Sequence, residues 1–366
     1  MKGASLLFVL LTLLAVADVH AASYFVDTAA QFNSLTDKFG ASFSSLHAGD
    51  RVLLKGGTSW GGLIATLTGS MTDAEAQSNP AIVYACDASY NPTVGGVTVA
   101  GLCQIDLAGS GIVFAGIVFG STSGMNKQGL YADYSGNDTA AYMIELDPLS
   151  RYMTVSHVKF DYCGRDNTDV NNDHYGAWLF LNGYHHTIQY CEFQGRDFNP
   201  NDINQPNPAL RTSIRDATVV IYKGTTDTVD WGYHTVRYNY FGQRLIPMSS
   251  DSRLYTPGDG TTATDLSNGW ETIRNGNSSF VSVDFNNTIE YNVFYHALYA
   301  VDGGISDNSG EPECISNKSR KNTYRHNTFL NNYGQLSLRQ GDYCVVQGNY
   351  FLARRRLRCE GQHCVQ

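Results

Sequence analysis

A six-residue pattern of apolar and polar positions recurs through the later two thirds of the chain. It reads apolar, x, x, then Asn, Cys or a β-branched residue, x, Phe. Side-chain character alternates with period two within each copy, and Gly, Asn, Asp and Ser flank the copies, so each copy predicts a strand rather than a helix. The copies are FAGIVF (114–119), VSHVKF (155–160), IQYCEF (188–193), VRYNYF (236–241), IEYNVF (289–294), YRHNTF (324–329) and VQGNYF (346–351).

The final phenylalanines of these copies lie at variable intervals, of which the shortest runs from Phe329 to Phe351. A coil of fixed minimum length with loop insertions gives such spacing. Parallel strands stacked coil upon coil form a right-handed parallel β-helix, with equivalent residues about 4.8 Å apart. We therefore expect a single-domain, all-β solenoid over residues 23–353, with the phenylalanines in an internal stack.

Four asparagines share one position of this repeat. Because they are in register with the buried phenylalanines, we expect an internal ladder in which each amide bonds to the next. The alternative is that they are surface turn residues. They are Asn239, Asn292, Asn327 and Asn349.

The two ends of the chain differ from the repeat. Residues 1–22 combine Lys2, a short apolar run and small residues near the end, which is typical of a cleavable secretory signal. The helix-like spacing of residues 28–39 predicts an amphipathic helix that caps the first coil. Residues 354–366 lack the repeat and predict an irregular basic tail, where we expect the natural chain to be truncated or altered.

The composition of the chain argues against some classes of binding partner. A formal net charge of −9 argues against nucleic acid or an anionic membrane, and no later stretch is apolar enough for a membrane helix. A secreted protein would expose its eight cysteines to an oxidising compartment, although their spacing does not define pairs. Possible glycosylation sequons begin at Asn137, Asn277, Asn286 and Asn317.

The stretch GEPECISNKS (310–319) carries the first candidate chemistry. In a strand, Glu311 and Glu313 point to the same side. Two neighbouring carboxylates repel each other unless a cation lies between them, and hard oxygen ligands suit calcium. The alternative is a solvated surface pair.

Two cations follow at a spacing close to one coil. The step from Lys318 to Arg339 is one residue shorter than the minimal coil from Phe329 to Phe351, which places the two cations on neighbouring rungs of a β-helix. An anionic ligand between them would explain the pair, and a neighbouring arginine would lower the pKa of the lysine toward the range of a base. The alternative is two solvated charges on the surface.

These segments resemble polysaccharide lyase family 6, which includes chondroitinase B and alginate lyases. The likeness extends over nearly the whole mature chain except the tail. It is carried by NGWETIR (268–274), IEYNVF (289–294), GEPECISNKSRKNTYRHNTFLNN (310–332), GQLSLRQG (334–341) and VVQGNYFL (345–352).

The resemblance implies a site with named roles. Calcium would be held by Asn268, Glu311 and Glu313. Lys318 would be the base, and Arg339 would serve the leaving group. Supporting roles would fall to Glu271, placed near the ion or the lysine, and to Arg274. Gln340 stands where relatives often have histidine. Two further basic residues that could line a substrate groove are Lys223 and Arg244.

The activity implied is β-elimination on an anionic uronate polysaccharide, which leaves a 4,5-unsaturated uronate. Alginate is the preferred substrate, and dermatan or chondroitin sulfate is the other candidate. Two alternatives share the fold: a glycan-binding β-helix without catalysis, and a pectin-type glycoside hydrolase. The hydrolase would use pairs of aspartates and release reducing ends without a double bond.

Overall fold

The computed structural model describes residues 21–57, 59–132, 139–163, 176–195, 217–222, 231–243, 245–246, 271–297, 299–300, 313–332, 334–352 and 358–359. The predicted signal therefore lies almost wholly outside the described residues, and it stays a prediction. The longest helix in the described part of the chain has six residues, too few to cross a membrane.

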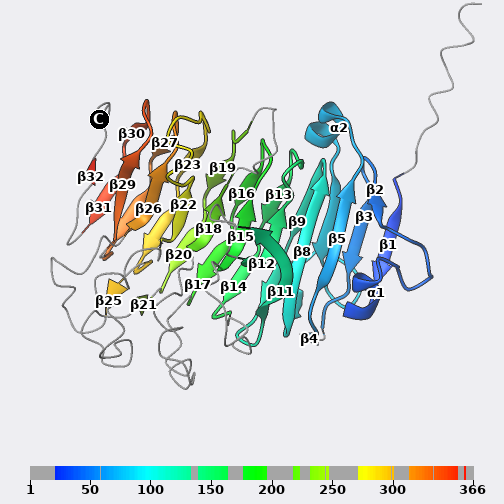
Figure 1. Ribbon diagram of the computed structural model, residues 1–366. Coiled ribbons are helices and arrows are strands. Elements are labelled where there is room, and N and C mark those ends of the chain that lie inside the picture. The colour runs from blue at the N-terminus through cyan, green and yellow to red at the C-terminus, as the bar shows by residue number, and fades with distance from the viewer. Residues whose placement is uncertain are drawn as a thin grey trace, which may run out of the picture.

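The described strands form three long sheets of parallel strands. Each sheet runs along the same axis, from the blue end to the red end of Figure 1. The first sheet has ten strands in the order of the chain. They are β1 (Ser23–Val26), β3 (Arg51–Leu54), β6 (Ala81–Ala85), β9 (Ile112–Ala115), β13 (Thr154–Ser156), β16 (Thr187–Gln189), β19 (Thr235–Arg237), β23 (Thr288–Glu290), β27 (Thr323–Arg325) and β30 (Val345–Gln347).

The second sheet has nine strands, each following a strand of the first sheet after a short bend or a loop. They are β4 (Ser59–Trp60), β7 (Val97–Val99), β10 (Ile117–Phe119), β14 (Lys159–Asp161), β17 (Glu192–Gln194), β20 (Tyr240–Gly242), β24 (Val293–Tyr295), β28 (Thr328–Leu330) and β31 (Tyr350–Leu352).

The third sheet has eleven strands and carries the predicted site. They are β2 (Ser45–Leu46), β5 (Ile64–Gly69), β8 (Leu102–Gly109), β11 (Gly124–Ala132), β12 (Thr139–Leu146), β15 (Gly176–Leu181), β18 (Ala217–Ile221), β22 (Ile273–Asn275), β26 (Glu313–Lys318), β29 (Gln335–Gln340) and β32 (Arg358–Cys359). Its pairings are parallel except between β11 and β12. A separate pair is formed by β21 (Leu245–Ile246) and β25 (Tyr299–Ala300).

This arrangement is the predicted parallel β-helix, with one correction to the repeat. Each six-residue copy was expected to be one strand, but it spans two short strands and the bend between the first and second sheets. In IEYNVF, for example, β23 ends at Glu290, Tyr291 has φ of 54°, and β24 begins at Val293. The third residue of every copy has positive φ, a backbone conformation that ends a strand.

Both internal ladders are confirmed. The seven phenylalanines stack with successive ring centroids 4.7 to 5.1 Å apart. The amide Nδ2 of Asn239 donates to Asn292 Oδ1 at 3.0 Å, and the same bond continues through Asn327 to Asn349. Asn239, Asn292 and Asn327 are almost completely buried, so these amides replace water for one another inside the coil.

A second ladder of polar side chains, which the six-residue pattern did not reveal, lies at the corner between the third and first sheets. His186 and His234 occupy two of its positions, and Asn287 and Asn322 occupy the next two. Backbone N–H groups donate along the row, from His186 to His234 Nδ1 at 3.3 Å and from His234 to Asn287 Oδ1 at 2.9 Å. The bond from Asn287 to Asn322 Oδ1 is 3.0 Å.

The ends differ in part from expectation. Of the helix expected over residues 28–39, only α1 (Ala29–Asn33) forms, with Phe32 buried, and its role as a cap stays a prediction. A second helix, α2 (Asp73–Ser78), begins after Thr72, whose side chain and that of Glu75 form a capping box. Within the tail expected to be irregular, Arg358–Cys359 form β32 beside β29.

Burial separates the candidate glycosylation sequons. Asn317 is fully buried and its side chain is hydrogen-bonded, so it cannot carry a glycan in the folded protein. Asn277 and Asn286 are partly exposed and remain candidates. Asn137 lies outside the described residues.

Candidate functional site

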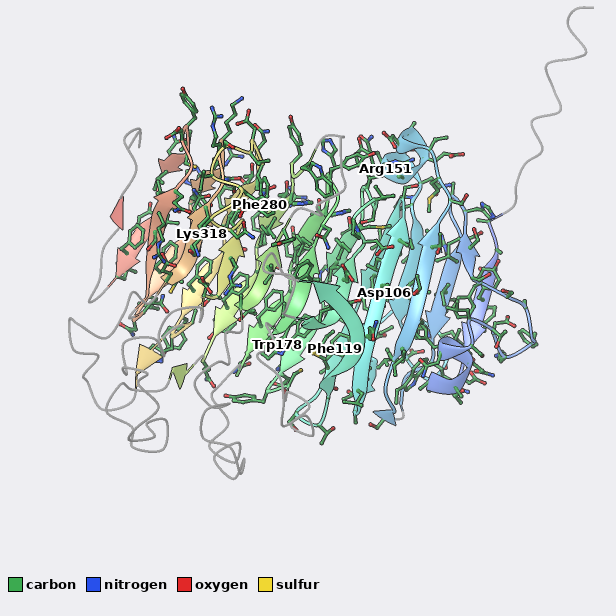
Figure 2. All side chains as sticks on the ribbon, in the orientation of Figure 1. Asp106, Phe119, Arg151, Trp178, Phe280 and Lys318 are labelled. Atoms are coloured by element: carbon green, nitrogen blue, oxygen red, sulfur yellow. The ribbon has the colours of Figure 1, made fainter. Side chains whose placement is uncertain are left out.

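Three neighbouring strands of the third sheet, β22, β26 and β29, bring the described candidate residues together. Their register aligns Arg274 with Ser316 and Ser316 with Ser337. These side chains face away from the core, because the neighbours Ile273, Ile315, Leu336 and Leu338 fill it. The site therefore lies on the outer face of the sheet, toward the C-terminal coils, where Figure 2 labels Lys318.

Glu271 is the anion at the centre of this group. Its carboxylate accepts a hydrogen bond from Arg274 at 2.8 Å and lies 3.9 Å from Lys318 Nζ. Only 3% of its side chain is exposed. Burial raises its pKa, but the charges of Arg274 and Lys318 outweigh burial and lower the pKa to about 2. Glu271 is therefore ionised at any working pH.

Lys318 shows the opposite balance. Its side chain is 14% exposed, and burial is the main cause that lowers the pKa of its amine. Glu271 raises that pKa, whereas Arg274 and Arg339 lower it. The ion pair does not dominate because it is long, at 3.9 Å, and Glu271 is already bonded to Arg274. The net effect moves the amine toward the range of a general base.

Arg339 lies opposite the end of β26 through a β-bulge. Asn317 pairs with Leu338, but the next residue, Lys318, pairs with Gln340 and skips Arg339. Arg339 is the extra residue of the bulge. The expected neighbourhood of Lys318 and Arg339 is thus present, while the direct partner of Lys318 is Gln340. The Oε1 of Gln340 is buried without a hydrogen-bond partner among the described residues.

Glu313 is the only predicted calcium ligand within the described part of the chain. Burial and the charge of Glu271 raise its pKa. Its Oε1 and the hydroxyls of Ser316 and Ser337 are buried and lie close to one another, because hydrogen bonding from the two serines lowers the pKa of the Glu313 carboxylate. The three oxygens therefore form one buried polar group. A carboxylate oxygen and hydroxyls are donors that a hard cation such as calcium accepts.

The remaining candidates cannot be placed. Asn268, Glu311, Lys223 and Arg244 lie outside the described residues. Among the residues that are described, no group of three or more His, Cys, Asp and Glu could hold a metal ion. The structure thus describes one of the three predicted calcium ligands.

The opposite end of the same sheet carries acidic residues that the sequence did not single out. Asp106 lies on β8, well separated along the helix from Lys318 (Figure 2). It accepts hydrogen bonds from Thr66 and Tyr142, both at 3.0 Å. Asn182 donates to Glu145 at 2.9 Å. Among the side chains of this sheet that the structure describes, the positive charges therefore lie on β22, β26 and β29.

The fold and the site define a class: a parallel β-helix with a charged site on the outer face of one sheet. The sequence profile described as Chondroitinase B matches residues 36–362. The chain therefore belongs to the chondroitinase B family of polysaccharide lyases. No curated protein sequence matches it significantly.

Solved structures of family 6 polysaccharide lyases share the fold. The alginate lyase AlyGC superposes with a TM-score of 0.62 at 21% identity, over 90% of this chain and 35% of that one. A mannuronic acid specific lyase from human gut microbiota superposes with a TM-score of 0.59 at 19% identity, over 90% of this chain and 59% of that one. The lyase from Pseudopedobacter saltans superposes with a TM-score of 0.55 at 19% identity, over 90% of this chain and 57% of that one. This chain thus spans between about a third and three fifths of their lengths.

Proposed function

We propose that this protein is a secreted polysaccharide lyase that cleaves a uronate polymer, preferably alginate, by calcium-assisted β-elimination. The observation that carries the proposal is the Lys318 amine. It is held on the outer face of the third sheet by a carboxylate at 3.9 Å, and burial and two arginines lower its pKa.

Lys318 acts as the base. The C5 proton of a uronate is weakly acidic, so the base must be neutral at working pH and held close to the proton. Lys318 takes that proton while a double bond forms between C4 and C5 and the bond from C4 to the glycosidic oxygen breaks. The electron pair leaves with that oxygen, which then receives a proton. No water is consumed.

Arg339 and Glu271 support this step. A guanidinium is a poor proton donor, so Arg339 stabilises negative charge on the intermediate or on the leaving oxygen. Glu271 stays ionised and orients the Lys318 amine from the other side. Arg274 holds Glu271 through the 2.8 Å bond and so fixes the direction of its carboxylate.

Calcium is assigned to Glu313 together with Asn268 and Glu311. The buried carboxylate of Glu313, grouped with the hydroxyls of Ser316 and Ser337, supports this assignment. Bound there, a calcium ion would neutralise the substrate carboxylate and make the C5 proton more acidic. The protein residues would hold that carboxylate beside Lys318.

The choice of alginate rests on the relatives, of which several are described as alginate lyases and one was solved with a trisaccharide. Dermatan and chondroitin sulfate are the other candidates, since the family profile is that of chondroitinase B. A uronate polymer of either kind fits the cationic group formed by Arg274, Lys318 and Arg339.

One experiment tests the proposal. The purified protein is offered alginate, its two homopolymer blocks and dermatan sulfate, and the ultraviolet absorbance of the unsaturated uronate is followed with calcium and with excess chelator. We expect a calcium-dependent rise on at least one polymer and none with Lys318→Met. Such a rise from the Lys318→Met variant would refute the assignment of the base.

The same assay separates the alternatives. New reducing ends without ultraviolet absorbance would indicate a hydrolase. Retention of the protein on an alginate gel with neither product would indicate a glycan-binding β-helix. Full activity in excess chelator would remove the role of calcium.

A further inference from the structure

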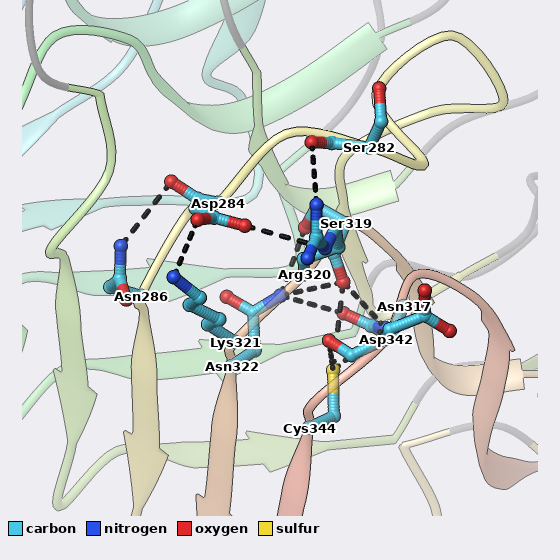
Figure 3. Close-up of polar contacts among 10 residues, drawn as sticks. All are labelled: Ser282, Asp284, Asn286, Asn317, Ser319, Arg320, Lys321, Asn322, Asp342 and Cys344. Atoms are coloured by element: carbon cyan, nitrogen blue, oxygen red, sulfur yellow. Dashed lines mark hydrogen bonds and ion pairs between the residues drawn. The ribbon is translucent and has the colours of Figure 1, made fainter. Parts of the chain in front are cut away.

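Asn317 lies directly before Lys318 and points into the coil. It is fully buried, and its amide Nδ2 donates to the backbone carbonyls of Ser319 at 3.0 Å and Gln340 at 2.9 Å. Figure 3 shows Asn317 within a buried polar group that includes Ser319, Asn322 and Cys344. None of the roles assigned above uses this side chain.

The two carbonyls lie on different coils. Ser319 follows Lys318 at the end of β26, and Gln340 ends β29, directly after Arg339. The register of the two strands changes between Asn317 and Lys318, where Arg339 is the extra residue. One amide therefore ties together the two strand ends on either side of the bulge, and these ends carry the base and its neighbouring arginine.

The orientation of that amide is fixed from the other side. Asn317 Oδ1 accepts hydrogen bonds from Asn322 Nδ2 at 2.9 Å and Tyr324 Oη at 2.8 Å. Tyr324 Oη accepts in turn from Asn275 Nδ2 at 2.8 Å. A side-chain amide has two donor hydrogens and two acceptor sites, and these four bonds occupy them all. A saturated buried network of this kind specifies one arrangement.

We propose that Asn317 is a positioning residue that holds the β-bulge between β26 and β29 and thereby sets Lys318 and Arg339 at the same place on the sheet. This inference rests on the proposed function, because Lys318 and Arg339 are the base and the charge-stabilising group of that proposal. It adds a residue that contacts no substrate and acts through the ends of two strands.

The test uses two matched variants of the full chain. Asn317→Ser shortens the side chain so that it cannot reach both carbonyls. Asn292→Ser makes the same change at a fully buried asparagine of the ladder that runs from Asn239 to Asn349, where Asn292 bonds to Val236 and Asn327. Thermal unfolding, kcat, KM and the pH dependence of the rate are measured for both.

Both variants should lose thermal stability. Only Asn317→Ser should lower kcat. We expect a loss of about 100-fold, because a displacement near 1 Å at a reacting group has an effect of that size. Its KM should change by less than about threefold. The rise of its rate with pH should also move to higher pH, because a displaced Lys318 is less buried. Tyr324→Phe removes a single donor to Asn317 and should give about a tenfold loss of kcat.

A second readout does not depend on turnover. Reductive methylation with 13C labels the lysine amines, Lys318→Arg identifies the signal of Lys318, and its titration is compared between the wild type and the variants. If the wild type is inactive but the Lys318 titration differs between the wild type and Asn317→Ser, the proposed function is overturned and the positioning role is supported. Loss of stability in Asn317→Ser with kcat, pH dependence and titration as in Asn292→Ser would overturn the positioning role.

Discussion

The mixed ladder of histidine and asparagine makes a quantitative prediction about acid stability. His234 is buried and accepts the backbone N–H of His186 at Nδ1, so this nitrogen carries no proton and the ring is neutral. Asn287, one position further, accepts the N–H of His234 with a side-chain oxygen. We therefore expect His234→Asn to keep the ladder bond while removing the titrating group.

The magnitude follows from the pKa. Burial, assisted by His185, lowers the pKa of His234 to about 3 from an ordinary value of 6.5. Between these pH values the unfolded chain binds a proton that the folded chain does not, so stability falls as pH falls from 6.5 toward 3. The full difference is about 5 kcal/mol, of which roughly 3 kcal/mol is lost by pH 4.5. A domain is stable by only about 5 to 15 kcal/mol in total.

The assay is chemical unfolding of the wild type and His234→Asn at pH 7 and pH 4.5. At pH 7 the two proteins should differ by no more than about 1 kcal/mol, because the ladder bond is kept. At pH 4.5 the variant should be more stable by roughly 3 kcal/mol. Both proteins carry the same remaining groups, so the change in their difference reports position 234 together with its effect on His186, whose pKa His234 lowers. A difference that stays the same at both pH values would refute the reasoning.

Three further predictions concern the site and the core. Glu271→Gln removes a negative charge that lies 3.9 Å from the Lys318 amine and stabilises its protonated form by up to about 4 kcal/mol at an effective dielectric of about 20. The pH at which the lyase rate rises should therefore fall by roughly 1 to 3 units. Glu313→Gln should weaken calcium binding at least tenfold by calorimetry, and equal affinity would exclude Glu313 as a ligand. Phe241→Ala should cost about 3 to 5 kcal/mol in denaturant unfolding, whereas Tyr350→Ala, at an exposed position, should cost within about 0.5 kcal/mol.

The repeat made the fold predictable from the sequence. A phenylalanine that returns once per coil must lie above its counterpart, and the asparagines in the same register follow it into the interior. The conformation within each copy was less visible, because five of the seven residues at this position, Tyr291 among them, are large side chains in a backbone region where glycine is more usual. The second ladder had a weaker signal, a histidine or asparagine before a threonine, as in His234–Thr235 and Asn287–Thr288.

For the candidate residues that the structure describes, the sequence predicted which lie together but not how they are arranged. The spacing of Lys318 and Arg339 placed them on neighbouring strands. Spacing alone could not reveal that the repeat lengthens by one residue between Asn317 and Lys318. The bulge brings together two strand ends that are distant in sequence, since Asn317 donates to the carbonyl of Gln340, 23 residues further along the chain. The sequence did not indicate that Ser316 and Ser337 belong to the site, because a serine in a strand is ordinarily exposed to solvent.

The charges of the site explain why a base and a cation would be needed together. With Lys318 protonated, it joins Arg274 and Arg339 as a third positive charge, against Glu271 and Glu313. Lys318 must lose its proton to act as a base, which leaves two cations against two carboxylates, and Glu311 would add a third. Such a site would not attract a uronate carboxylate, least of all in a protein of net charge −9. A divalent cation at Glu313 restores positive charge at the pH where Lys318 becomes active, so the affinity for substrate should fall with rising pH more steeply when calcium is withheld.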